Sequence, residues 1–102
     1  MSEVLIDMQH RQLAAREASQ LLRVLSNENR LLLLCQLSRG ERSVGELEDM
    51  LGIRQPTLSQ QLGVLRNEEL VQTRREGKQI FYRIADSRAQ EVLETLYRLY
   101  CS

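Results

Sequence analysis

Two short helical patterns and a β-hairpin pattern follow one another between residues 43 and 83, and this order constrains the fold more than any other part of the chain. Ser43 and Glu46 have the spacing of a capping box, in which a hydroxyl and a carboxylate satisfy the free amides at a helix start. The residues that follow have an apolar face at helical spacing. Gly52 can then adopt the left-handed conformation that ends a helix.

A second short helix is predicted after a turn at Ile53 and Arg54. Pro56, the only proline of the chain, is expected at the first helical position, where a missing N–H is tolerated. Leucines at positions i, i+4 and i+7 then form a narrow stripe that can pack on the preceding helix. They are Leu58, Leu62 and Leu65.

The opposite side of this second helix carries small, polar and mostly uncharged side chains, instead of the Lys and Glu typical of a solvated face. They are Thr57, Ser59, Gln60, Gly63 and Asn67. Gln can bond bidentately to adenine, and Ser and Thr can bond several bases, so this face is typical of a helix that reads DNA. We therefore predict that Thr57, Ser59 and Gln60 read base edges. Gln55, at the start of the helix, is a fourth candidate.

After residue 70 the apolar period falls from about 3.6 residues to about 2, which indicates β-strands at residues 71–75 and 79–84. Gly77, in the turn between them, can supply the positive φ of a hairpin. Basic side chains cluster around this hairpin: Arg74, Arg75, Lys78 and Arg83. A solvated surface hairpin would explain the segment taken alone. Directly after a helix of the reading type, we instead predict a wing that contacts DNA through Arg75 and Lys78.

Helix, turn, helix and basic hairpin in this order form a winged helix-turn-helix, whose second helix enters the DNA major groove. Lys plus Arg equals Asp plus Glu in this 102-residue chain, 14 of each, so the whole chain is neutral. Residues 54–83 nevertheless carry six basic and three acidic side chains, a net charge of +3. One basic end on a neutral chain fits DNA binding by the paired ends of a dimer, and it argues against unspecific coating of nucleic acid.

Amphipathic helical patterns flank this core at residues 9–25 and 87–101. They carry more apolar surface than one small domain can cover, so we predict that they form the interface of a symmetric homodimer suited to a palindromic operator. Between the first of them and the core, residues 28–37 are apolar nearly all round, as expected of a central buried helix. Ser26 or Asn27 can cap this helix.

The predicted architecture is one mainly α domain over residues 1–102, with four helices, a small β-hairpin and a last helix. Its DNA-binding core is expected at residues 43–84. Residues 1–7 are acidic, unlike the start of a signal peptide, and the longest apolar run is far too short to span a membrane. We therefore expect a soluble cytoplasmic protein that does not act at a membrane. The sequence has no catalytic triad pattern and no Gly-rich phosphate loop, which argues against an enzyme and calls for no cofactor.

With this helix order, the chain resembles the ArsR family of bacterial winged-helix repressors over nearly its whole length. Three stretches match the family's patterns, namely residues 25–31, 43–47 and 55–62. Within the family the chain is most similar to the BigR and HlyU type of sulfide-, persulfide- and redox-responsive regulators. Gln61 departs from the wider family, many of whose members have His there. The resemblance therefore predicts the fold but not the operator sequence.

Many members of this family bind metal, either through cysteines in the third helix or through Asp, His and Glu on the last helix. Residues 44–51 contain neither Cys nor His, and residues 87–101 contain no His. The only histidine, His10, lies near the N-terminus, where we expect fraying. We predict no metal site, because a tetrahedral zinc site needs nitrogen or sulfur ligands that are mostly missing.

Two cysteines remain, Cys35 in the second helix and Cys101 near the end of the chain. From the residues alone, Cys35 can be a small buried apolar side chain and Cys101 an incidental thiol. The resemblance implies more, because the BigR and HlyU type carries a cysteine pair at this spacing that forms a disulfide or polysulfide bridge as its switch. On that resemblance we predict that Cys35 and Cys101 sense reactive sulfur species or oxidants. One alternative is a DNA-binding regulator of the same fold with passive cysteines, either an anti-repressor or a metal-independent repressor. Another is a protein-binding module.

Overall fold

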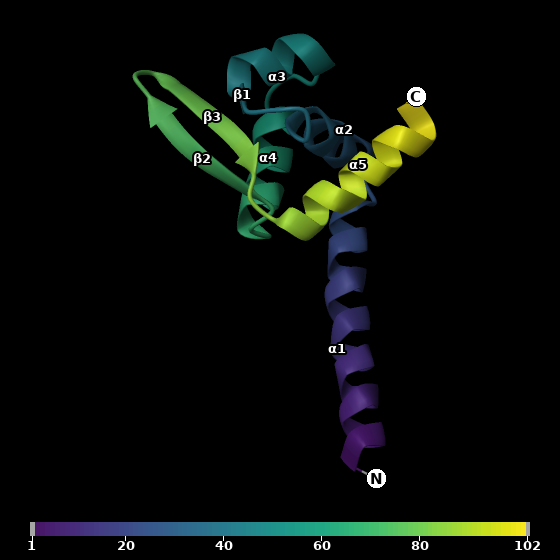
Figure 1. Cartoon of the computed structure of the whole chain (residues 1–102). Helices are drawn as coiled ribbons and strands as arrows, with labels where there is room; N and C mark the ends of the chain where they lie inside the picture. The colour runs from purple at the N-terminus through teal and green to yellow at the C-terminus, as the bar shows by residue number, and fades with distance from the viewer. Residues whose placement is uncertain (1, 102) are drawn as a thin grey trace.

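The computed structural model describes residues 2–101, with side chains from residue 7 onward, as five helices and one three-stranded sheet. The elements are α1 (Ser2–Leu25), α2 (Glu28–Leu37), β1 (Arg42–Ser43), α3 (Val44–Leu51), α4 (Thr57–Asn67), β2 (Val71–Glu76), β3 (Gln79–Ile84) and α5 (Ser87–Cys101). Figure 1 shows α2, α3, α4 and the sheet gathered in one body, from which α1 projects as a long rod and across which α5 runs. This confirms the predicted mainly α winged helix-turn-helix.

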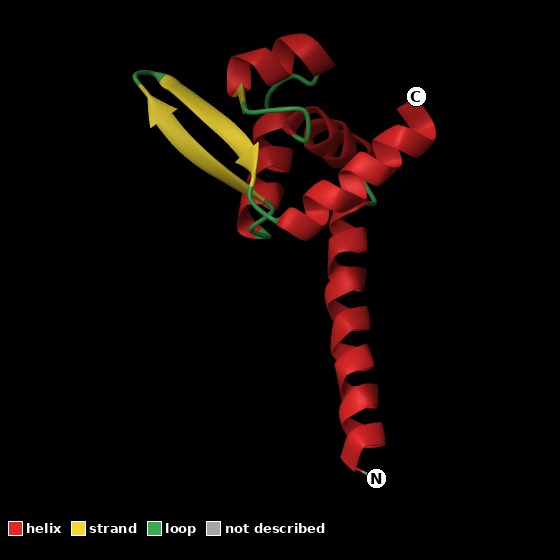
Figure 2. Ribbon diagram, viewed as in Figure 1, coloured by secondary structure: helices red, strands yellow, loops and turns green. Residues whose placement is uncertain are grey.

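The sheet has the antiparallel order β1-β3-β2 (Figure 2). Its β2–β3 hairpin is the predicted one, and Gly77 in its turn has a φ of 62°. The prediction of a two-stranded hairpin was incomplete, because β1 pairs with β3 through Arg42 opposite Tyr82 and Ser43 opposite Phe81. A strand of two residues is too short to show a period in the sequence. It joins the wing directly to the start of α3.

The predicted capping groups lie at the helix ends. Ser43 Oγ accepts a hydrogen bond from the Glu46 backbone N–H at 3.1 Å, and the Ser43 N–H donates to Glu46 Oε1 at 2.9 Å. Asn27, one of the two candidates for the α2 cap, accepts from the Arg30 N–H at 3.0 Å. Gly52 ends α3 with a φ of 68°. These caps are local in sequence, which is why the pattern could predict them.

Two expectations about helix starts were wrong. Pro56 is the residue before α4 and not its first helical residue, because α4 begins at Thr57. The first helix begins at Ser2 and not near residue 9. His10 therefore lies inside α1, exposed to solvent, and not in a frayed end.

The core is a cluster made mostly of leucines, to which all five helices contribute. The predicted stripe of α4 is buried in full, with Leu58 and Leu65 at 0% exposure and Leu62 at 2%. It packs in one apolar cluster with leucines of the other helices, namely Leu33, Leu34, Leu37, Leu47 and Leu93. The expectation that α2 is buried nearly all round holds only in part, because Leu32 is 41% exposed. Burial of each leucine contributes roughly 1.5–3 kcal/mol, so this cluster fixes the position of α4.

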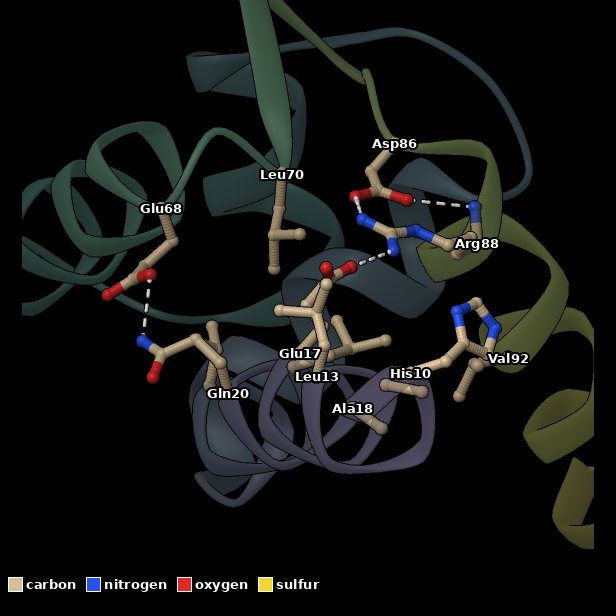
Figure 3. Close-up of a pocket in the computed structure, with 13 residues that line it drawn as sticks. His10, Leu13, Glu17, Ala18, Gln20, Glu68, Leu70, Asp86, Arg88 and Val92 are labelled. Atoms are coloured by element: carbon tan, nitrogen blue, oxygen red, sulfur yellow. Dashed lines mark hydrogen bonds and ion pairs between the residues drawn. The ribbon is translucent and has the colours of Figure 1, made fainter. Parts of the chain in front are cut away.

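Apolar side chains of α1 and α5 stay exposed in the single chain. Leu22 is 60% exposed, and Leu99 is 67% exposed. A hollow of about 690 Å³ lies beside α1 (Figure 3). It is lined by side chains of α1, by Glu68 and Leu70, and by Asp86, Arg88 and Val92. Arg88 of α5 pairs across this hollow with Glu17 of α1 at 2.7 Å. Among the described residues, no helix has the length and apolarity that a membrane span requires.

Candidate nucleic-acid interface and thiol pair

The polar face of α4 points away from the leucine core. Ser59 and Gln60 are exposed in the first turn, whereas Thr57 is half-buried. Gln55 Oε1 accepts the Ser59 backbone N–H at 3.1 Å, so Gln55 caps the start of α4 in addition to standing at its exposed end. Gln55 is exposed too, but its side-chain oxygen is already engaged, so Ser59 and Gln60 are the best placed of the four predicted readers.

A hollow of about 590 Å³ separates α4 from the wing and brings two predicted contact residues together. Ser59 lines it from α4, and Lys78 lines it from the β2–β3 turn. Gln55, Thr57, Gln60 and Arg75 do not line it. Arg75 is exposed elsewhere on the wing, opposite Ile80 in the β2–β3 register.

Arg66 also lines this hollow, and the sequence analysis did not include it among the contact residues. Ser59, Gly63 and Arg66 stand at positions i, i+4 and i+7 of α4, so they share one face of the helix. This spacing is the signal that could have identified Arg66. Its guanidinium adds a second cation to the one that Lys78 supplies.

The basic side chains of the wing differ in whether they form ion pairs. Within the described part of the chain, neither Arg75 nor Lys78 forms an ion pair. Arg83 donates to the neutral Gln72 side chain at 2.7 Å. Arg74 differs, since it pairs with both Glu41 and Glu76. Exposed cations without a carboxylate partner are the ones that can exchange counterions for DNA phosphates.

Arg30 connects α4 to the junction of α1 and α2. Its Nε donates to the Val24 carbonyl at 2.7 Å, and its Nη1 donates to Gln61 Oε1 at 3.1 Å. Gln61 is the position at which the chain departs from many ArsR members. The contact gives the polar side chain of α4 a defined partner, and it makes the position of α4 depend on the position of α2.

The two cysteines lie on helices that pack against each other. Cys35 is half-buried on α2, Cys101 is exposed at the end of α5, and both are free thiols. Burial raises the pKa of the Cys35 thiol, and the charge of a Cys101 thiolate raises that pKa further, as expected for neighbouring groups. Cys35 is therefore mainly protonated at neutral pH.

Polar contacts hold α5 on the C-terminal end of α2. Gln90 Nε2 donates to the Ser38 carbonyl at 3.0 Å, and the Arg39 guanidinium lies 4.5 Å from the centre of the Tyr97 ring. Tyr97 and Cys101 stand at i and i+4 of α5, so Cys101 shares the side of α5 that faces α2. The structure thus brings the two predicted sensor residues to one helix pair.

A metal site was not predicted, and the structure offers no ligand cluster for one among the residues it describes. No group of three or more His, Cys, Asp or Glu side chains in that part of the chain could hold a metal ion. Asp86, which immediately precedes α5, instead makes local contacts. Asp86 Oδ1 accepts the backbone N–H groups of Arg88 and Ala89 and so caps α5.

Comparison with known proteins identifies a family model and similar transcriptional regulators. Residues 27–73 match the family model described as "Bacterial regulatory protein, arsR family". The chain is 57% identical to the "Biofilm growth-associated repressor" of Agrobacterium fabrum, over 86% of this chain and 75% of that protein. It is 40% identical to the "Transcriptional activator HlyU" of Vibrio cholerae, over 94% of this chain and 89% of that protein.

A solved structure has the same fold. The transcriptional repressor BigR from Xylella fastidiosa superposes with a TM-score of 0.85 at 49% sequence identity. The superposition covers 93% of this chain and 97% of that one. The likeness therefore extends beyond the central motif to the flanking helices α1 and α5.

Proposed function

The chain belongs to the ArsR family of bacterial regulatory proteins, and we propose that it is a transcriptional repressor that leaves its operator when Cys35 and Cys101 become bridged. The observation that carries the DNA-binding part is the exposed uncharged face of α4 beside unpaired wing cations. The name of the Agrobacterium fabrum relative supports repression. Since such a protein binds chromosomal DNA, we place it in the cytoplasm.

In this proposal α4 lies in the major groove and the wing lies along the backbone. Ser59 and Gln60 read base edges, with Thr57 and Gln55 at the start of the helix. Lys78, Arg75 and Arg66 neutralise phosphates. The residues concerned fall within the stretch 43–84, which we take as the DNA-binding core.

A second copy of the chain supplies the other half-site. The exposed apolar side chains of α1 and α5 support a homodimer formed by helices at about residues 9–25 and 87–101. A symmetric dimer would place two α4 helices about 34 Å apart, the spacing of successive major grooves on one face of DNA. This also explains how a neutral chain with a small basic end binds DNA, because phosphate contacts double.

The proposed switch is a sulfur transfer followed by ring closure. The exposed Cys101 thiolate attacks the outer sulfur of a persulfide RSSH, forms Cys101–S–SH and releases RSH. The Cys35 thiolate then attacks the inner sulfur, forms the Cys35–Cys101 disulfide and releases H2S. The sum is two thiols plus RSSH giving one disulfide, RSH and H2S. A second persulfide can oxidise the Cys101 persulfide and the Cys35 thiol to a trisulfide, with release of another RSH and H2S.

Bridging would reach α4 through α2. The bridge would tie α5, the proposed dimer helix, to the last turn of α2, while Arg30 in the first turn of α2 donates to Gln61 of α4. A shift of α2 against the dimer helices would therefore move the two α4 helices relative to each other. A displacement of a few Å spoils the match to fixed half-sites.

The test of the proposal uses one protein sample for two measurements. We would record the intact mass before and after glutathione persulfide, and a gel shift on promoter DNA from the protein's own locus. Loss of two free thiols together with loss of the shift supports the switch. Unchanged mass with intact DNA binding would leave a regulator with passive cysteines.

The second candidate is an activator or anti-repressor of the same fold. The name of the Vibrio cholerae relative favours it, because a protein named as an activator is 40% identical to this chain. Transcription from the bound promoter, with and without this protein, separates the two. Less transcription when the protein is present supports the repressor, and more transcription supports the activator or anti-repressor.

Gln60→Ala tests the reading face. We expect binding to the operator to weaken by roughly 1–3 kcal/mol and discrimination at one base pair to be lost, because a side chain that bonds a base edge carries that sequence information. Anisotropy titrations against operators that differ at single positions measure both effects. An equal loss on every sequence would instead make Gln60 a backbone contact.

Lys78→Ala tests the wing. We expect weaker binding to all sequences, and a plot of log K against log salt that is flatter by about one unit per half-site, because one phosphate contact is lost. The measurement is the same titration at several salt concentrations. Loss of specificity with an unchanged salt slope would mean that Lys78 contacts a base and not a phosphate.

A further inference from the structure

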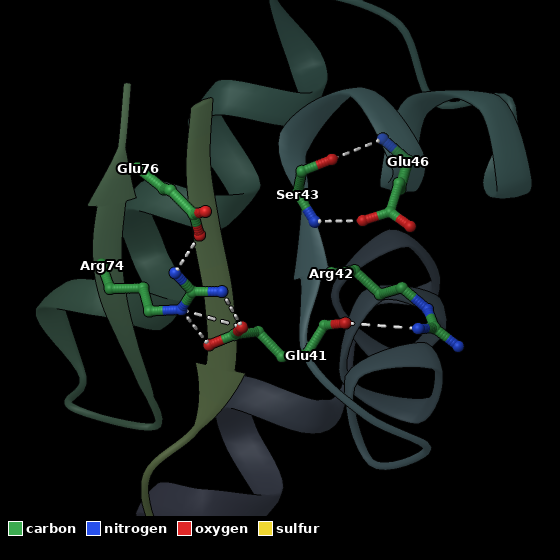
Figure 4. Close-up of polar contacts among 6 residues, drawn as sticks. All are labelled: Glu41, Arg42, Ser43, Glu46, Arg74 and Glu76. Atoms are coloured by element: carbon green, nitrogen blue, oxygen red, sulfur yellow. Dashed lines mark hydrogen bonds and ion pairs between the residues drawn. The ribbon is translucent and has the colours of Figure 1, made fainter. Parts of the chain in front are cut away.

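One arginine side chain spans the full width of the wing sheet (Figure 4). Arg74 on β2 stands opposite Phe81 on β3, and its guanidinium carbon lies 4.4 Å from the centre of that ring. Beyond the ring, Arg74 Nε donates to the two carboxylate oxygens of Glu41 at 2.9 and 3.0 Å. Since Glu41 immediately precedes β1, the side chain crosses β3 and joins the two outer strands.

The charge of this guanidinium is already compensated. Nη2 lies 2.7 Å from Glu41 Oε1, and Nη1 lies 2.6 Å from Glu76 Oε2. The hydrogen bond from Arg74 is the main cause that lowers the pKa of Glu41, so this carboxylate is ionised at every pH at which DNA binding would be measured. Two carboxylates on one guanidinium give the group a net charge of −1. Arg74 thus differs from Arg75 and Lys78, which have no such partner in the described chain.

The contact sits where the wing meets the helix-turn-helix. Glu41 leads into β1, and Ser43 of β1 forms the capping box that starts α3. Ser43 also stands opposite Phe81, the residue under the Arg74 guanidinium. The Arg74–Glu41 contact, which we call the brace, can therefore hold the hairpin at a fixed angle to α3, and through α3 to α4. Ser59 and Arg66 of α4 and Lys78 of the hairpin turn line one hollow, so a change in this angle would change its width.

We propose that Arg74 is a positioning residue and not a phosphate contact: paired with Glu41, it holds the wing at the angle that presents Arg75 and Lys78 to the DNA backbone. The inference rests on the proposed DNA-binding function. It separates the wing arginines by role, although the sequence presents Arg74 and Arg75 as one basic pair.

The test compares Arg74→Met, Glu41→Gln and the double variant, with Lys78→Ala as the reference for a phosphate contact. Met keeps apolar cover over Phe81 but cannot pair with Glu41. We expect each single variant to weaken operator binding by about two- to fivefold, as expected for the loss of an exposed ion pair. The double variant should be no weaker than either single one, because both remove the same contact. The salt slope should stay that of the wild type.

Two outcomes would overturn the proposal. The first is an Arg74→Met slope as flat as that of Lys78→Ala. The second is tighter binding by Glu41→Gln, which would mean that a released Arg74 reaches a phosphate.

A DNA-independent measurement keeps the brace separate from the DNA-binding function. Amide hydrogen exchange in β1 and β3 should speed up in both single variants, whether or not the protein binds DNA. If the wild-type protein bound no DNA but these amides exchanged faster in the variants, the proposed function would fail and the brace would stand. Unchanged exchange in both variants would refute the brace itself.

Discussion

The Cys35→Ser/Cys101→Ser double variant is expected to keep its operator after exposure to glutathione persulfide, whereas the wild-type protein should lose about 100-fold in affinity. That loss corresponds to about 2.7 kcal/mol, which lies within the usual range of allosteric coupling. The variant should bind DNA as tightly as the reduced wild type, because neither thiol lies on the polar face of α4 or on the wing. Gel shifts with and without the persulfide, on the same samples, measure both quantities.

The single variants separate the two chemical steps. Cys35→Ser keeps the exposed Cys101, so we expect a gain of one sulfur atom in mass without a bridge, and DNA binding should persist. Cys101→Ser removes the exposed acceptor and leaves a half-buried thiol, so little change in mass is expected. Release of DNA by persulfide from the double variant would contradict the switch.

The pH dependence of bridge closure follows from the position of Cys35. Because burial raises the pKa of this thiol, a smaller fraction is thiolate at neutral pH, and the thiolate is the attacking form. Closure should therefore be slow near pH 7 and should speed up as the pH rises toward the raised pKa. The rate at which the second free thiol is lost, followed at several pH values, measures this dependence.

The sequence predicted the elements whose causes are local. The capping box at Ser43, the left-handed Gly52 and the leucine stripe of α4 each depend on residues within about two helical turns, so their spacing is visible in the chain. The start of α4 was placed one residue too early at Pro56, since the proline pattern allows both the first helical position and the one before it. The strand β1 was missed, because only its pairing with β3 defines it.

Contacts between distant residues could not be predicted in the same way. Arg74 and Glu41 are 33 positions apart, and Arg30 and Gln61 are 31 apart. No period links such residues, and many other basic and acidic pairs in the chain would be equally compatible with the sequence. The proposed pairing of Cys35 with Cys101 rests on the family resemblance, because the residues alone also fit two passive thiols. The contact of α2 with α5 adds the physical support that the sequence lacked.

Leu58→Ala is expected to destabilise the fold by about 2–5 kcal/mol, the cost of truncating a fully buried leucine. Leu58 is 0% exposed and lies directly between Thr57 and Ser59, so its packing determines where the proposed DNA-reading face of α4 points. DNA binding should therefore weaken even under conditions in which the variant stays folded. Urea unfolding at fixed protein concentration measures the first effect, since dimerisation would otherwise shift the midpoint.

Met50→Ala is the matched control for this variant. Met50 lies in α3 and is 50% exposed, so its truncation should change stability by no more than about 0.5 kcal/mol. With a total stability of about 5–15 kcal/mol for a domain of this kind, the Leu58 variant loses a large share and the Met50 variant almost none. Equal effects of the two substitutions would mean that the leucine stripe does not dock α4. The angle of the reading helix would then have to depend on polar contacts such as that between Arg30 and Gln61.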